Sequence, residues 1–269
     1  MQQFEQHGVA VARENPNFRV FTPNRGLCRT GSLRRHAHGG AMGVARFLRA
    51  SAPGSLHLTV RPIRPPHLVC MEFISLLFIL AMGIHWLNLQ GQRKRTALLA
   101  EQLRPFQIEK NMAQLTGAYM RALGESDLAR QQQIMQLQEQ AEQQMAHEFQ
   151  NLAREFAKLP APVARGFKLA LPYIDQLSPK ATFDMRRMLE VHAQGIQRAV
   201  HNLQGLSTKE RSFRMMGEMF LMQHSCHWFC RSKTIASARM VTQHQTRYEQ
   251  ALDAVSPETR QAYLAVVQG

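Results

Sequence analysis

The chain contains few cysteines for its length. Four cysteines stand among 269 residues, at positions 28, 70, 226 and 230. Small secreted domains that depend on disulfide bonds use many more, so this count excludes a disulfide scaffold. It also predicts a reducing compartment for the C-terminal part.

The sequence also lacks the short motifs that mark common enzyme classes. It has no G-x-x-x-x-G-K-[ST] phosphate loop, no G-x-S-x-G nucleophile turn and no H-E-x-x-H zinc motif. Carboxylates such as Glu148, Glu155 and Glu190 stand among basic residues in helix-forming segments, where surface pairing between successive turns explains them. The sequence therefore predicts no cofactor and no reaction, and it favours a protein that acts by interaction over an enzyme.

Residues 1–70 contain no lysine. They carry ten arginines and two acids, Glu5 and Glu14, and so hold much of the net charge of +14. A basic arm that binds nucleic acid usually mixes Lys with Arg, so nucleic acid is the less favoured partner. The segment is also rich in Gly, Pro, Ser and His and has no helical or strand period. Either it is a disordered basic tail, or it is not translated and the protein starts at Met71. The second interpretation is favoured, because GC-rich DNA read as coding yields this composition.

Residues 73–89 form an apolar run without a polar stripe. Its only polar members are Ser75, His85 and Asn88. A helix of a soluble bundle normally keeps one polar face, whereas a bilayer core of about 30 Å needs roughly 20 apolar residues, with about 17 as a lower limit. The run predicts a transmembrane helix. A buried core helix and an interfacial helix are the alternatives.

The charges on either side of the run predict its orientation. Glu72 precedes it and Arg93, Lys94 and Arg95 follow it, the reverse of the order in a cleaved signal peptide. We therefore expect an uncleaved signal-anchor with its basic end in the cytoplasm. Trp86 is expected near the cytoplasmic interface of the membrane.

The predicted location is a lipid bilayer, specifically a bacterial inner membrane crossed once. Ten arginines before the span would compete with the three basic residues after it for the cytoplasmic side, and a start at Met71 removes this conflict. The expected organisation is a basic segment at 1–70, the anchor with its basic flank at 71–95, and a cytoplasmic helical domain at 97–269.

The remainder of the chain favours an all-α fold with long antiparallel helices. Ala, Leu, Gln, Glu, Met and Arg dominate it, and alternating β-branched residues are almost absent. Pro105 should end the helix that continues from the anchor, since proline removes a backbone donor. Further helices are expected at 106–123, at 127–159, at 162–177 with an interruption at Pro172, at 179–203, at 208–254 and at 257–267. Ser126, Ser178, Ser207 and Ser256 are their expected N-caps.

The expected helix at 127–159 has one continuous apolar stripe. Two interpretations are open: the helix packs inside its own domain, which is favoured, or it self-associates as a coiled coil with a second copy. Steps of four recur along the stripe, which weakens the seven-residue repeat of a coiled coil. The stripe consists of Ile134, Leu137, Ala141, Met145, Phe149, Leu152 and Phe156.

One cluster of metal-ligating residue types stands in the segment MQHSCHWFC, residues 222–230. Cys226, His227 and Cys230 are spaced so that one helix could present all three to neighbouring regions of a face, with His224 one turn away. Thiolates and imidazoles are good zinc ligands. The surrounding Met, Phe and Trp residues favour a buried core helix instead, and a Met-rich partner surface is the third interpretation.

The sequence as a whole predicts a single-pass membrane protein whose helical domain is an interaction or scaffold module. Two alternatives come from other classes. One is a nucleic-acid binder that uses the Arg-rich segment 1–70, and the other is a metal- or thiol-dependent protein centred on Cys226, His227 and Cys230.

Overall fold

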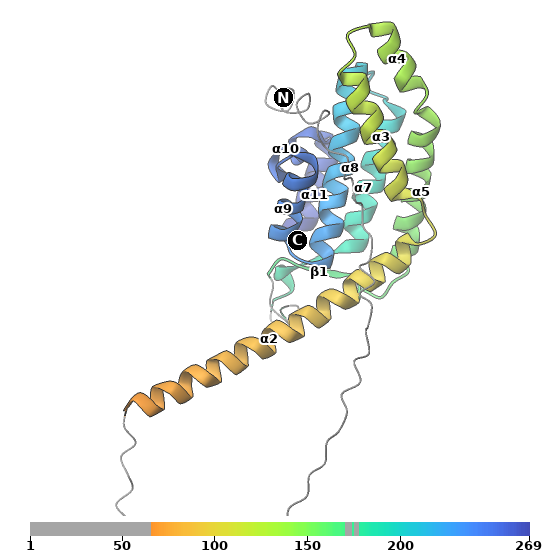
Figure 1. The fold of residues 1–269 in the computed structure, drawn as a ribbon. Coiled ribbons are helices and arrows are strands. Elements are labelled where there is room, and N and C mark those ends of the chain that lie inside the picture. Colours follow the sequence, from red (N-terminus) through yellow and green to blue (C-terminus); the bar gives the residue numbers. More distant parts are fainter. Residues whose placement is uncertain (1–65, 170–173, 175–177) are drawn as a thin grey trace, which may run out of the picture. The chain divides into compact units, whose positions relative to one another are not determined.

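The chain after residue 65 is almost entirely helical, which confirms the predicted all-α class (Figure 1). A computed structural model describes residues 66–169, 174 and 178–269, without the side chains of 66–70 and 179. The segment 1–65, with its predicted basic arm, and Cys28 lie outside the described residues. The described helices are α2 (Pro66–Leu103), α3 (Ile108–Leu123), α4 (Leu128–Gln136), α5 (Glu139–Ala157), α7 (Met185–His201), α8 (Thr208–Cys230), α9 (Lys233–His244), α10 (Tyr248–Ala254) and α11 (Pro257–Gln268).

Helix α2 contains the apolar run. It begins at Pro66, upstream of Met71, and ends at Leu103, so the predicted end near Pro105 is confirmed. Within the described residues it is the one helix long and apolar enough to cross a membrane, and none of its apolar window is buried. Residues 80–269 belong to one compact unit, and the described residues 66–79 belong to another.

The core of the unit 80–269 lies between four helices that alternate in direction. α3, α5, α7 and α8 run up and down beside one another (Figure 1), and α5 packs on α7 while α7 packs on α8. α9 and α10 pack on α8, and α11 packs on α7. The residues between them are apolar and include Phe149 and Phe156 of α5, Leu189 of α7 and Phe229 of α8, each fully buried or nearly so. Burial of this apolar surface is the main force that holds the bundle together.

The single helix predicted at 127–159 is wrong: the chain turns at Leu137 and Gln138, which separate α4 from α5. Leu137 is 72% exposed, so the turn takes this residue out of the predicted stripe. Asp127, one residue after the expected cap, accepts the amide of Ala129 at 2.9 Å and begins α4. The break lets α5 lie along α7 independently of α4.

The helix expected at 162–177 is wrong over residues 165–167, which form a strand; Ile174 is helical, and 170–173 and 175–177 lie outside the described residues. The expected start of the next helix at Ser178 is also wrong. Strand β1 (Arg165–Phe167) pairs antiparallel with β2 (Thr182–Asp184), and Pro179–Ala181 is a 3-10 turn. Gly166 allows this pairing, because a Cβ there would collide with the ring of Phe183 on the opposite strand. α7 then begins at Met185, since Asp184 accepts the amide of Arg186 and acts as its N-cap.

The long helix predicted at 208–254 has the expected start but not the expected length. Ser207 and Glu210 form the predicted capping box of α8. α8 ends at Cys230, Ser232 caps α9, and Gln245 ends α9 in the left-handed region at φ 51°. These breaks fold α9 and α10 back against α8. Ser256 caps α11 as expected.

Candidate functional site

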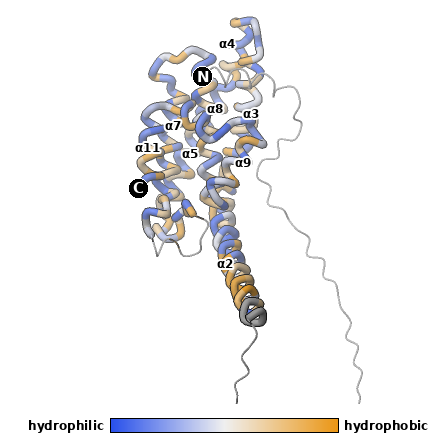
Figure 2. Tube along the Cα trace, turned by 90° about the vertical axis from the view of Figure 1, so that its left-hand side faces the viewer, coloured by the Kyte–Doolittle hydropathy of each residue, from blue (hydrophilic) through white to orange (hydrophobic). Residues whose placement is uncertain are grey.

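The predicted membrane-flanking residues lie along α2 on the approach to the helical domain. Figure 2 shows α2 changing from hydrophobic to hydrophilic residues toward the domain. Trp86 is 59% exposed, and Arg93 and Lys94 are exposed. Arg95 is only 8% exposed, unlike Arg93 and Lys94 beside it, and its predicted membrane-flanking role stays a prediction.

Arg95 is buried because it binds the end of α8. Its Nε donates a hydrogen bond to the carbonyl oxygen of Phe229 at 2.7 Å. The last carbonyls of a helix have no partner within the helix and carry partial negative charge, so a guanidinium is a favourable partner there. The guanidinium also lies over the ring of Phe167 in β1, 4.6 Å from its centroid. Burial lowers the pKa of Arg95, but a guanidinium remains charged.

Two further hydrogen bonds fix the same place. Arg231 donates from Nη1 to Oε1 of Gln92 at 3.0 Å, and Trp228 donates from Nε1 to the carbonyl oxygen of Phe167 at 2.9 Å. Three segments far apart in the sequence, namely α2, the β1 strand and the end of α8, therefore meet around Arg95. We refer to this place, formed by Gln92, Arg95, Phe167, Trp228, Phe229 and Arg231, as the α2 junction.

The second predicted site, Cys226, His227 and Cys230, borders the α2 junction, but its side chains have separate surroundings. Cys226 Sγ lies 4.0 Å from Met222 Sδ, and His227 Nδ1 lies 3.3 Å from Nη1 of Arg239. Cys230 lies beside Thr96 and Arg95 of α2. In the part of the chain that the structure describes, no three His, Cys, Asp or Glu side chains are grouped to hold a metal ion. The zinc site stays a prediction from spacing alone.

The protonation of these side chains favours packing. Burial raises the pKa of Cys226 and raises that of Cys230 to about 11, so both thiols are protonated at neutral pH. A thiol that stays protonated is a poor nucleophile. Burial, followed by the charge of Arg239, lowers the pKa of His227 to about 4. Neutral groups of this kind suit the interior of a helical bundle.

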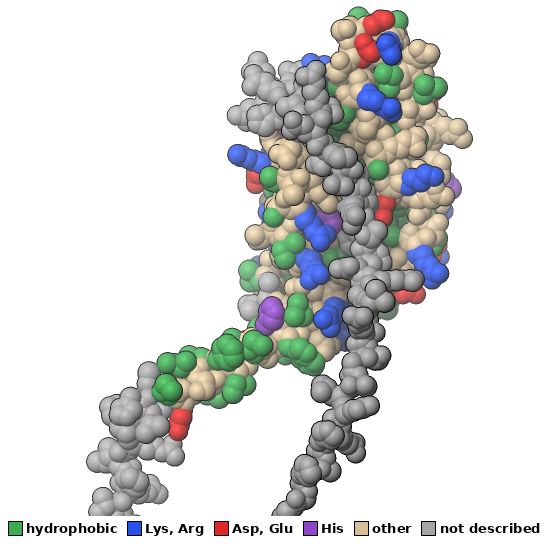
Figure 3. Space-filling model, in the orientation of Figure 1, with side chains coloured by type: hydrophobic (Ala, Val, Ile, Leu, Met, Phe, Trp, Pro, Cys, Tyr) green, Lys and Arg blue, Asp and Glu red, His purple; other side chains and the backbone are tan. Residues whose placement is uncertain are grey.

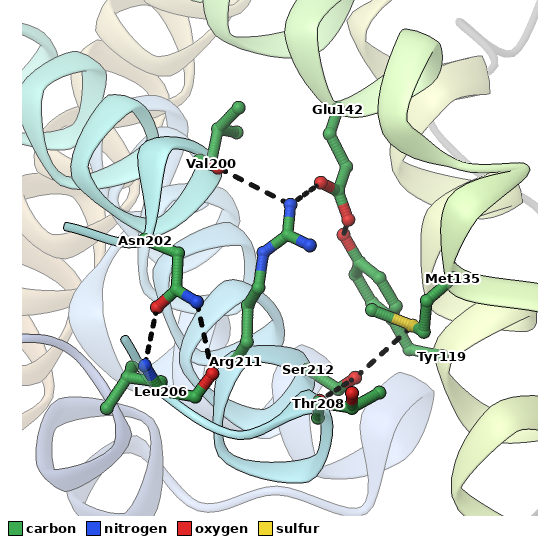
Figure 4. Close-up of polar contacts among 9 residues, drawn as sticks. All are labelled: Tyr119, Met135, Glu142, Val200, Asn202, Leu206, Thr208, Arg211 and Ser212. Carbon is green, nitrogen blue, oxygen red and sulfur yellow. Dashed lines mark hydrogen bonds and ion pairs between the residues drawn. The ribbon is translucent and has the colours of Figure 1, made fainter. Parts of the chain in front are cut away.

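A buried polar cluster that the sequence interpretation missed joins α3, α5 and α8 (Figure 4). Glu142 accepts the hydroxyl of Tyr119 at 2.6 Å and forms an ion pair with Arg211, which also donates to the carbonyl oxygen of Val200. Burial raises the pKa of Glu142, while Tyr119 and Arg211 lower it. Glu142 stands three residues before Met145, on the buried face of α5, and this was its only signal in the sequence.

A second buried carboxyl lies between α7, α8 and the start of α11. Glu218 is fully buried and accepts the amide of Ser256 at 3.1 Å. Gly195 of α7 makes room for it, since a Cβ there would collide with Glu218 and with Thr259. Burial raises the pKa of Glu218 to about 7. These contacts hold three helices together, and their burial separates them from any substrate in solution.

The comparisons with known proteins add no function. No family model, no curated protein and no solved structure matches this chain. The α2 junction is therefore the candidate site on geometry alone, because it joins the exposed apolar helix to the helical domain.

Proposed function

We propose that this chain is a single-pass membrane protein whose anchor, α2, holds a cytoplasmic interaction or scaffold domain at the membrane surface. The observation that carries the proposal is the exposure of the apolar stretch of α2. Leu76, Phe78, Leu80 and Trp86 are each between 58% and 66% exposed. A contiguous apolar surface of this kind is rare on a soluble monomer and suits a lipid environment.

The α2 junction supports the same proposal. Arg95 and Gln92 are bonded to α8 and its C-terminal flank by side chains, so α2 is attached to the domain by more than the backbone. The exposed Arg93 and Lys94 follow the apolar stretch at the position where basic residues favour the cytoplasmic side. The helical domain would then lie directly at the cytoplasmic face.

The packing of α5 limits how the domain could bind a partner. The apolar stripe of α5 is fully buried within the domain and is not accessible to a partner; it consists of Met145, Phe149, Leu152 and Phe156. A partner of the segment 127–159, a second copy included, would therefore meet α4. Leu128 of α4 and Leu137 of the turn that follows it are each 72% exposed.

The anchor is tested by alkaline carbonate extraction of membranes from cells that make the full chain. The protein is expected to stay in the membrane pellet, and the variant Leu77→Arg/Leu80→Arg is expected to be released, because charge inside a span is strongly unfavourable. Leu137→Arg changes a leucine outside the span that is 72% exposed, and this variant should stay in the pellet. Release of the unsubstituted protein by carbonate would overturn the proposal.

The scaffold role is tested by crosslinking in intact membranes followed by purification of the full chain. We expect a discrete crosslinked species that weakens in Leu128→Ser/Leu137→Ser and persists in Leu169→Ser. Leu169 is 53% exposed and lies next to β1, away from α4. If the chain is recovered only as an uncrosslinked monomer at every crosslinker length, the interaction role is wrong.

A further inference from the structure

The charge of the helical part is segregated along the sequence. The segments 73–100, 156–174 and 219–248 together contain ten Lys and Arg and no Asp or Glu. The rest of 71–269 contains thirteen Lys and Arg and seventeen acids. The three acid-free segments are the ones that supply the α2 junction, and each of them brings at least one cation to it or next to it.

Several of these cations stand around α2 at the junction. Arg93 and Lys94 are on α2 itself, and Arg231 donates a hydrogen bond to Gln92 of α2. Lys168 is the next residue in the sequence after Phe167, whose ring contacts the guanidinium of Arg95. Lys168 donates from Nζ to the carbonyl oxygen of Lys180 at 2.6 Å, which brings the exposed Lys180 beside it. On the face shown in Figure 3, Lys and Arg side chains lie on the domain next to α2. We define the basic collar as Arg93, Lys94, Lys168, Lys180 and Arg231.

The collar lies close to the end of the apolar stretch. Gln92 comes three residues after Leu89, which is about 4.5 Å along a helix axis, and Arg95 comes about 9 Å after it. The chain from Phe229 to Arg231 runs from the level of Arg95 back to that of Gln92, toward the apolar stretch. At physiological salt the Debye length is about 8 Å, so charges at this height lie within about one Debye length of the apolar boundary and still interact with a headgroup layer.

We propose that the basic collar binds the anionic headgroups of the bilayer that α2 crosses, and so fixes the helical domain against the membrane. This inference rests on the proposed membrane anchor. Phosphate groups of lipids suit the collar better than nucleic acid does, because the collar lies beside the end of an apolar helix, at the height that a headgroup layer would occupy. Lys233 is left out of the collar, since its Nζ lies 4.2 Å from the ring centroid of Tyr248 and is held there.

The test reconstitutes the full chain into nanodiscs of neutral phosphatidylcholine, alone or with about 30% phosphatidylglycerol, and measures lysine acetylation by mass spectrometry. Labelling of Lys180 is expected to be at least about threefold slower in the anionic discs, and about 0.5 M salt should remove the difference. Lys209 is the internal control. It is exposed at the start of α8, about 32 Å along the helix from Cys230, and its rate should be the same in both discs.

Variants and a competitor separate the possible outcomes. Arg93→Gln/Arg231→Gln should reduce the slowing at Lys180, whereas Arg130→Gln on α4 should not, and thermal melting checks that both fold. Equal Lys180 rates in the two discs, or equal slowing at Lys209, would overturn the inference. A DNA duplex added to neutral discs is the competitor. If it slows acetylation of Lys180 more than phosphatidylglycerol does, the ligand of the collar is nucleic acid and not lipid. A chain that does not enter the discs would instead contradict the membrane anchor.

Discussion

Arg95 and Phe229 are 134 residues apart in the sequence, yet Nε of Arg95 donates to the carbonyl oxygen of Phe229 at 2.7 Å. This bond joins the helix that carries the apolar stretch to the longest helix of the bundle core. Removing the partner of a buried carbonyl costs more free energy than the hydrogen bond alone, because water cannot reach the carbonyl to replace the donor. The stability of the domain should therefore depend on a residue of α2.

Arg95→Gln should reduce the free energy of unfolding by about 1–3 kcal/mol, because the shorter neutral side chain leaves the carbonyl of Phe229 without a charged donor. Denaturant unfolding of the full chain in detergent, followed by Trp fluorescence, measures this change. Lys94→Gln removes a neighbouring cation that is exposed, and it should change stability by no more than about 0.5 kcal/mol. Equal effects of the two variants would mean that the Arg95 bond does not stabilise the domain.

Arg211→Met should reduce stability by about 3 kcal/mol, because it leaves the carboxylate of Glu142 buried and without its counter-ion. The matched control is Arg130→Met, which breaks an ion pair with Glu125 whose arginine is 71% exposed and which should cost less than about 0.5 kcal/mol. Thermal melting of both variants gives the comparison. A melting temperature for Arg211→Met within error of the control would contradict a stabilising role for this pair.

Gly195→Ala and Gly117→Ala should change stability in opposite directions. A Cβ at Gly195 would collide with Glu218 and Thr259, which are both buried, so we expect a loss of about 1–3 kcal/mol. At Gly117 in α3 nothing lies within 4 Å of the added Cβ, and alanine should stabilise the helix by about 0.5–1 kcal/mol. If Gly195→Ala is as stable as the original protein, the close approach of α7 to α8 is looser than described.

Acidification should destabilise the domain. Burial lowers the pKa of His192 and His224 to about 3 and that of His227 and His244 to about 4, against an ordinary value of 6.5. Between pH 6.5 and pH 4 the unfolded chain therefore binds protons that the folded chain does not, so stability falls as the pH falls. Denaturant unfolding at a series of pH values should show net proton uptake on unfolding in this range.

Glu218 opposes this trend. Its pKa is raised to about 7 in the folded state from an ordinary 4.5, so between these values unfolding releases a proton from it. Glu218→Gln removes that release, and the variant should lose stability more steeply than the original protein as the pH falls from 6.5 to 5. An identical slope in the two proteins would mean that Glu218 is ionised in the folded state.

The residues that the sequence predicted correctly act on their immediate neighbours. Pro105 ends α2, Ser207 and Glu210 cap α8, and Ser256 caps α11, because each effect depends on a few adjacent backbone groups. The breaks at Leu137 and after Cys230 were missed, since they depend on which helices pack together. The strand pair was missed for the same reason: Gly166 and Phe183 meet only after the chain has folded back.

The candidate site shows the same division. Arg93, Lys94 and Trp86 are exposed, as a local pattern of charge and hydropathy can predict. Arg95 has the same local sequence context but is buried, because its partners Phe229 and Phe167 come from distant segments. The sequence likewise placed Cys226, His227 and Cys230 near one another but did not indicate which neighbour each side chain contacts.

The attachment of α2 through Gln92 and Arg95 has a mechanical consequence. The apolar stretch has no polar face that would hold it at one rotation about its own axis, so its rotation is set at the domain end. Inserting one residue between Leu89 and Gln92 would turn the residues before the insertion by about 100° and shift them by about 1.5 Å relative to the domain. The number of residues between Leu89 and Gln92 therefore sets how the apolar stretch is rotated relative to the domain.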